Sequence, residues 1–129
     1  MKLLLDTNVL IWWLGSSRRV TGRALEAIAS PDNIAYVSVA SAWELAIKVA
    51  LGRLELPGSL VSWLSKRLDE EQFTILPINL AHVLSVEALP LHHGDPFDRL
   101  LIAQAMAEGC WIVTADRIFH HYDVRIIDC

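Results

Sequence analysis

The sequence has 129 residues, of which 53% are hydrophobic and 20% are charged, a length and composition that suit one globular domain and exclude a disordered chain. No apolar run reaches the ~18 residues of a membrane span, and the short N-terminal apolar stretch is interrupted at Asp6, which makes a poor signal peptide. The net charge of −4 argues against broad, non-specific nucleic-acid binding, but a nuclease whose carboxylates hold cations stays open. We expect a single domain over residues 1–129 with no membrane association.

Short apolar runs alternate with segments of helical spacing along the chain. Lys2–Leu5 is apolar without alternation, which is typical of a strand buried on both faces. Helix stops are marked by Pro31, Gly52, Pro90 and Gly109. In chain order the expected elements are a strand at Lys2–Leu5, a helix at Val20–Ser30, a strand at Ile34–Val39, helices at Ala42–Leu51 and Leu60–Leu68, a strand at Phe73–Ile78, helices at Ala81–Leu89 and Pro96–Glu108, and strands at Trp111–Thr114 and Val124–Ile127.

This alternation of strands and helices predicts an α/β fold with a parallel sheet covered by helices on both faces. In such folds the functional site lies beyond the carboxyl ends of the strands. Two cysteines, Cys110 and Cys129, form no CxxC pair and no disulfide framework. The simplest setting for this usage is the reducing cytoplasm.

Four acidic residues fall where such a site is expected. Asp6 follows the first strand, and Glu44 lies early in the helix after the second strand. Asp98 lies in the first turn of the helix Pro96–Glu108, and Asp116 follows the strand Trp111–Thr114. Because clustered carboxylates repel one another, a fold would gather them mainly to bind a cation such as Mg²⁺ or Mn²⁺.

Each acid also has a purely structural interpretation. Asp6, Asp95 and Asp116 could each cap the helix that follows, and Asp98 would suit the dipole of its helix. Glu44 completes a capping box, S-A-W-E, that starts at Ser41, and it lies four residues before Lys48 in helix-stabilising ion-pair spacing. Each alternative is reasonable by itself, but a joint metal site accounts for all four acids together.

The chain resembles the PIN domain, and specifically the VapC-type ribonuclease toxins of bacterial type II toxin–antitoxin systems. The stretches that carry the resemblance are LLLDTNVLIWW, SVASAWELAIKVALGRLELP, LPLHHGDPFDRLLIAQAMAEG and WIVTADRIFHHYDV, and together they span Lys2 to Val124. The resemblance implies a three-layer α/β/α sandwich around a short parallel sheet. It also implies that Asp6, Glu44, Asp98 and Asp116 bind Mg²⁺ or Mn²⁺ and support hydrolysis of single-stranded RNA.

The same resemblance suggests further roles and partners. It implies a cognate antitoxin and a second toxin subunit in a homodimer, and it makes Asp6 and Asp98 the most direct metal ligands. Adjacent Trp12 and Trp13 point ~100° apart on a helix, so one could face outward. The remaining candidates are Asn8, Asp95 and Thr114 for the outer shell, Lys48, Arg53, Arg99 and Arg117 for RNA phosphates, and Trp12, Trp13, Leu54 and Leu56 for an antitoxin groove.

Other residues favour simpler interpretations. Lys48 could instead pair with Glu44, and Arg99 and Arg117 could form structural salt bridges. Paired histidines at His92-His93 and His120-His121 match no compact zinc pattern, so loop or surface positions are expected. Core filling accounts for Trp43, Trp63 and Trp111.

Two other functions fit part of the sequence pattern. One is an aspartate-based phosphatase or phosphotransfer domain, since a nucleophilic Asp after the first strand occurs in haloacid-dehalogenase-like phosphatases. Those proteins need a second Asp where this chain has Asn8, and a late Lys that is absent. The other is a non-catalytic PIN-like binding module, against which the full set of acids argues.

Overall fold

Five short parallel strands form one sheet in the computed structural model, which describes residues 1–129. The sheet has the order β3-β2-β1-β4-β5, with β1 at its centre. Because the chain moves from β1 toward β3 and then crosses to β4, the carboxyl ends of β1 and β4 flank the crevice where such sheets bind ligands. The strands are β1 (Lys2–Leu5), β2 (Ile34–Ser38), β3 (Thr74–Leu76), β4 (Trp111–Thr114) and β5 (Ile126–Asp128).

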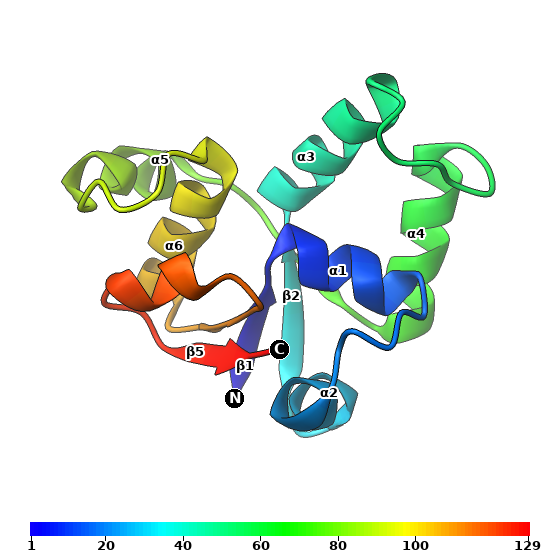
Figure 1. The fold of residues 1–129 in the computed structure, drawn as a ribbon, viewed down its shortest axis with the longest axis horizontal. Coiled ribbons are helices and arrows are strands. Elements are labelled where there is room, and N and C mark those ends of the chain that lie inside the picture. The colour runs from blue at the N-terminus through cyan, green and yellow to red at the C-terminus, as the bar shows by residue number, and fades with distance from the viewer.

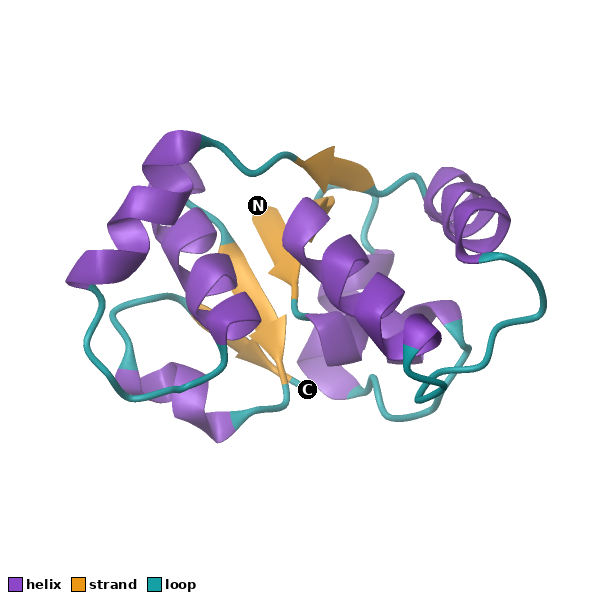
Figure 2. Ribbon diagram, turned by 90° about the horizontal axis from the view of Figure 1, so that it is seen from above, coloured by secondary structure: helices purple, strands orange, loops and turns teal.

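Helices cover both faces of the sheet, which gives the expected three-layer α/β/α sandwich (Figures 1 and 2). Helices α5 and α6 lie on one side, and α1, α2 and α4 lie on the other. None of these helices is both long and apolar enough to cross a membrane. The helices are α1 (Thr7–Leu14), α2 (Gly22–Ala29), α3 (Val39–Ala50), α4 (Leu60–Glu71), α5 (Leu80–Ser85) and α6 (Pro96–Glu108), with short 3₁₀ turns η1 (Val86–Ala88) and η2 (Arg117–His121).

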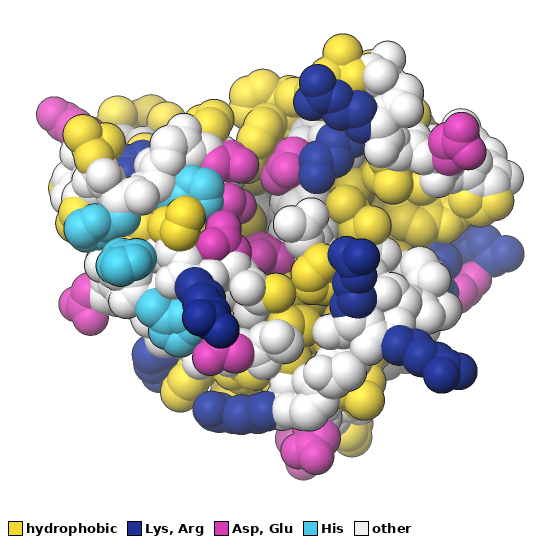
Figure 3. Space-filling model, in the orientation of Figure 1, with side chains coloured by type: hydrophobic (Ala, Val, Ile, Leu, Met, Phe, Trp, Pro, Cys, Tyr) yellow, Lys and Arg dark blue, Asp and Glu magenta, His cyan; other side chains and the backbone are white.

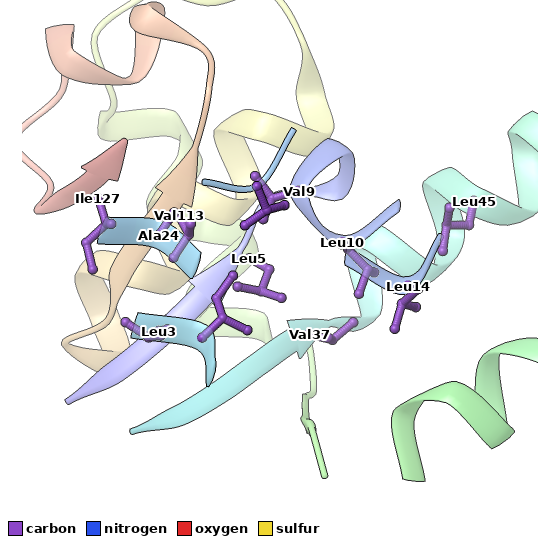
Figure 4. Close-up of a cluster of buried hydrophobic side chains, with 12 residues drawn as sticks. Leu3, Leu5, Val9, Leu10, Leu14, Ala24, Val37, Leu45, Val113 and Ile127 are labelled. Carbon is purple, nitrogen blue, oxygen red and sulfur yellow. The ribbon is translucent and has the colours of Figure 1, made fainter. Parts of the chain in front are cut away.

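The side chains of the central strand pack into two separate hydrophobic cores, because successive side chains of a strand point to opposite faces. Leu3 and Leu5 enter the core beneath α1 and α2, which Figure 4 shows together with Leu10 and Val37. Leu4 enters the other core, beneath α6. All three leucines are fully buried, so β1 is held rigidly from both sides and fixes the position of the residue that follows it.

The sequence predicted every strand and most helices, with shifted boundaries. The predicted capping box at Ser41 is wrong, because α3 begins at Val39 and Ser38 is its N-cap, accepting a hydrogen bond from the Ala40 N–H at 3.0 Å. Ser41 is instead buried inside α3, where it accepts a hydrogen bond from the hydroxyl of Thr7. Glu44 therefore has no capping role, which the predicted box at Ser41 would have given it.

Candidate metal centre

Asp6 begins the site at the carboxyl end of β1, and it is 5% exposed. One carboxylate oxygen accepts the Val9 N–H at 2.8 Å, so the predicted helix cap exists. The other oxygen accepts a hydrogen bond from the hydroxyl of Thr114, at the end of β4. The Thr114 hydroxyl also accepts the N–H of Asp116 at 3.0 Å. A single threonine therefore links two of the four acids. Asp6 both caps α1 and contributes its carboxylate to the candidate site.

Glu44 contributes an unusual carboxylate from the second turn of α3. Its Oε2 lies 3.4 Å from Lys48 Nζ, which is the ion pair that the sequence spacing predicts. Its Oε1 is buried and has no hydrogen-bond partner. Because an unpaired buried acceptor is costly, this oxygen is suited to a cation that the protein itself does not supply.

Asp98 stands in the first turn of α6, and Asp95 is the N-cap of that helix. Asp95 accepts the N–H groups of Phe97 and Asp98 at 2.8 and 3.3 Å, as the D-P sequence predicts. Helix α6 leads directly into β4, so its N-terminus lies at the carboxyl edge of the sheet. Figure 3 shows acidic side chains (magenta) gathered at the centre of this face.

His93 is the site residue that the sequence analysis missed. Its Nε2 lies 2.9 Å from Asp98 Oδ2 and 3.3 Å from Asp116 Oδ2, and its side chain is 14% exposed. His93 lies on a loop, as the sequence predicts, but its side chain is directed at the acids instead of at solvent. The available signal was its position two residues before the N-cap Asp95, which places it beside the first turn of α6.

Two carboxylates of this cluster, Asp6 and Asp98, have raised pKa values. Burial, together with the charges of Asp95, Asp6, Glu44 and Asp116, raises the pKa of Asp98 from 3.8 to about 8. Burial likewise raises the pKa of Asp6 to about 6, although hydrogen bonds from Thr114 and Val9 oppose the rise. A site that disfavours its own negative charge gains most from a bound cation.

The predicted cationic residues divide into two groups. Arg53 and Arg117 are exposed and form no salt bridge, whereas Lys48 forms the ion pair with Glu44 that its structural interpretation predicts. Arg99 is 9% exposed, and its guanidinium donates to the carbonyls of Val86, Leu89 and Pro90. We therefore correct the expectation of an RNA contact for Arg99, which builds the loop before α6 and forms no salt bridge.

The predicted apolar groove residues lie on the α1 side of the molecule. Trp12 and Trp13 are both half-buried, so the expected division into one inward and one outward ring is wrong. Trp13 donates a hydrogen bond to Glu71 at 3.0 Å, and Arg19 stacks over Trp12. Leu54 and Leu56 are half-buried, and Asn8 is exposed on α1.

Two of the three tryptophans assigned to the core do pack there. Trp63 and Trp111 are partly buried against the core beneath α1 and α2. Trp43 is 58% exposed, and its ring meets that of Phe97 edge-on with centroids 4.8 Å apart, so its assignment to the core is wrong.

A parallel α/β/α sandwich with carboxylates gathered at the carboxyl edge of its sheet defines a class of proteins built to hold divalent cations there. Residues 3–125 match the PIN domain model, and the chain belongs to the PIN domain family. It is 36% identical over 116 residues to Ribonuclease VapC22 of Mycobacterium tuberculosis (strain ATCC 25618 / H37Rv), an alignment that covers 89% of this chain and 87% of that protein. The family match decides against the haloacid-dehalogenase-like alternative.

Solved structures share the fold over nearly the whole chain. VapBC2 from Rickettsia felis, bound to a DNA fragment from its promoter, aligns with a TM-score of 0.76 and 18% identity over 99% of this chain and 98% of that chain. DNA-bound VapBC from Salmonella typhimurium aligns with a TM-score of 0.66 and 19% identity over 99% of this chain and 98% of that chain. At such identities the likeness establishes the fold alone.

Proposed function

We propose that this PIN domain protein is a metal-dependent endoribonuclease and acts in the cytoplasm as the toxin of a type II toxin–antitoxin pair. The observation that carries the proposal is the carboxylate cluster with the unpaired buried Oε1 of Glu44, in a chain that is 36% identical to Ribonuclease VapC22. The proposed ion is Mg²⁺ or Mn²⁺, because hard cations take several carboxylate oxygens and keep positions for water and phosphate. The proposed substrate is single-stranded or loop RNA.

Each acid has a defined part in this proposal. Asp6 and Asp98 would hold the ion most directly, with Glu44 and Asp116 completing the cluster. When bound, a divalent ion activates water and stabilises the charge that develops on a phosphodiester. Thr114 orients Asp6 from outside the metal shell, and Asn8 and Asp95 are further outer-shell candidates. Lys48, Arg53 and Arg117 would contact RNA phosphates, because cationic side chains bind the backbone without reading sequence.

Cleavage of RNA tests this function directly. Purified protein, freed of any antitoxin, would be incubated with single-stranded RNA in Mg²⁺, in Mn²⁺ and in EDTA. We expect cleavage with either ion and none in EDTA. A protein that binds RNA but never cuts it would support the non-catalytic alternative, and cleavage unaffected by EDTA would contradict the metal-dependent proposal.

Metal binding also predicts a stability change that needs no RNA. Mg²⁺ or Mn²⁺ should raise the Tm of the protein, because an ion bound only to the folded state stabilises it. Asp6→Asn should abolish that rise. The variant should stay folded without metal, and be at least as stable as the parent, because Asn still caps α1 and repulsion within the cluster falls.

The matched control for this measurement is Asp32→Asn, which removes a carboxylate from an exposed turn outside the cluster. This variant should keep the full metal-dependent rise in Tm. An equal rise in Asp6→Asn would remove Asp6 from the metal site. A marked loss of metal-free stability in Asp6→Asn would favour the purely structural capping role.

An apolar surface beside the acids supports the antitoxin partner. Figure 3 shows hydrophobic side chains (yellow) gathered between α3 and α4, to the right of the acid cluster. Half-buried Trp12 and Leu54 pack against the core on this side. We propose that an amphipathic antitoxin segment lies there and places an Arg or Lys among the acids, since apolar grooves commonly receive such segments.

Trp12→Ala should weaken antitoxin binding by ~2 kcal/mol or more, because buried interface tryptophans often dominate binding energy. RNA cleavage by the isolated protein should be unchanged. Trp13→Ala is a less direct test, because Trp13 also binds Glu71 of α4. Calorimetric titration with the antitoxin checks the prediction, and parent-like affinity in a folded Trp12→Ala protein would place the groove elsewhere.

The homodimer is supported by a second apolar surface, on the opposite side of α3. Trp43 and Phe97 line a mostly apolar pocket there with Val83 and Leu100. Exposed Leu80 and Leu84 extend this surface along α5. Apolar patches of this kind commonly mark contacts between proteins, and we propose a second copy of the chain as the partner.

A further inference from the structure

His93 touches two of the four acids and has no role in the function proposed so far. Its Nε2 lies within hydrogen-bond distance of Asp98 and Asp116, so these three side chains could be taken for a set of metal ligands. The alternative is that His93 donates its ring N–H to the two carboxylates. The other ring nitrogen decides between these roles, because a neutral imidazole carries its proton on only one nitrogen.

The hydrogen-bond pattern makes Nε2 the donor. The backbone N–H of Asp95 points at His93 Nδ1 at 3.0 Å, so Nδ1 accepts and carries no proton. A histidine that binds metal through Nε2 ordinarily donates its Nδ1–H to a carbonyl or carboxylate, which is the reverse arrangement. The proton on Nε2 is then directed at Asp98 Oδ2 and Asp116 Oδ2.

The surrounding loop holds the imidazole in this place. The backbone N–H of His93 donates to the hydroxyl of Tyr122 at 2.7 Å, and Arg99 donates to the same hydroxyl. Arg99 is in turn fixed by the three loop carbonyls that it binds. The His93 ring also packs edge-on against the fully buried Phe119. Three contacts of His93 itself, with Asp95, Tyr122 and Phe119, therefore determine where Nε2 lies.

We propose that His93 is a positioning residue of the metal centre: its Nε2–H bridges Asp98 and Asp116 and fixes the carboxylates for the ion without binding the ion itself. The inference rests on the proposed function, because it assumes that these acids bind a divalent metal. Outer-shell donors of this kind typically contribute 10–100-fold to metal affinity.

Binding of Mn²⁺ tests the inference without RNA. His93→Ala should raise the Kd for Mn²⁺ by ~10-fold or more. His93→Gln, whose side-chain amide can still donate, should recover part of the loss and serves as the test if His93→Ala does not fold. His92→Ala is the matched control, because His92 is exposed on the same loop and its ring meets His121 and Tyr122, away from the acids. Its Kd should equal that of the parent.

Pulsed electron paramagnetic resonance of the Mn²⁺-loaded protein separates a donor from a ligand. We expect oxygen ligands only in the parent and in both His93 variants. A directly coordinated nitrogen that disappears in His93→Ala would overturn the inference and make His93 a ligand. Unchanged affinity in both variants, or tighter binding in His93→Ala, would also overturn it. A parent protein that binds no Mn²⁺ would instead refute the proposed metal centre, which distinguishes the two failures.

Discussion

Asp98→Asn is expected to lower RNA cleavage by ~10²–10³-fold in Mg²⁺. The substitution keeps the size of the side chain and an oxygen that can accept the His93 N–H, but it removes a negative charge from the cluster. A metal that polarises phosphate supplies several kcal/mol of transition-state stabilisation, and each 1.36 kcal/mol lost lowers the rate tenfold. The measurement is the initial rate of cleavage at saturating Mg²⁺.

The control variant for this prediction lies one helical turn away. Asp95→Asn removes an equal charge, but Asn caps a helix as well as Asp does, so the bonds to Phe97 and Asp98 should persist. Its cleavage rate should stay within about tenfold of the parent, the range of a modest outer-shell effect. Parent-like cleavage by a folded Asp98→Asn protein would remove Asp98 from the catalytic centre.

The acid cluster could be predicted from sequence because it depends on topology. The carboxyl ends of parallel strands meet at one edge, so Asp6 and Asp116 are brought together by any fold that pairs β1 with β4. The start of α3 could not be predicted in the same way. Ser38 and Ser41 are both good caps, and the choice between them depends on the extension of β2 and on the burial of Ser41 against Thr7.

The inward direction of the His93 side chain could not be predicted from the sequence, for a physical reason. Residues of irregular loops show no periodicity, so nothing in the sequence indicates which side chains point inward. The sequence favours an RNA contact for Arg99, because cationic residues near acids often bind phosphate, yet tertiary contacts enclose it. The backbone N–H of His93 binds the Tyr122 hydroxyl, which holds the histidine beside the acids. The enclosure of Arg99 and the inward direction of His93 share one cause, since both residues bind the Tyr122 hydroxyl.

The metal-free protein should lose stability as the pH rises from about 4 to about 8. In the unfolded chain Asp98 titrates near 3.8, but in the folded protein burial and neighbouring acids raise its pKa to about 8. Between these values the folded state holds a proton that the unfolded state has released, so folding is favoured at low pH and the contribution disappears above pH 8. Asp6, with a pKa raised to about 6, acts in the same direction over a narrower range.

Thermal unfolding of metal-free protein at several pH values between 4.5 and 8.5 measures this effect. Asp98→Asn should show a clearly shallower fall in Tm with pH than the parent, because its amide does not titrate. Saturating Mg²⁺ should also offset the fall, since the ion binds the deprotonated carboxylates and replaces the protons that they lose. Identical pH profiles for the parent and Asp98→Asn would show that Asp98 ionises normally and that its neighbours do not form a repelling cluster. A shallower fall of Tm with pH in Asp98→Asn, with the fall in Asp32→Asn equal to that of the parent, would locate the repulsion among carboxylates at the proposed metal site.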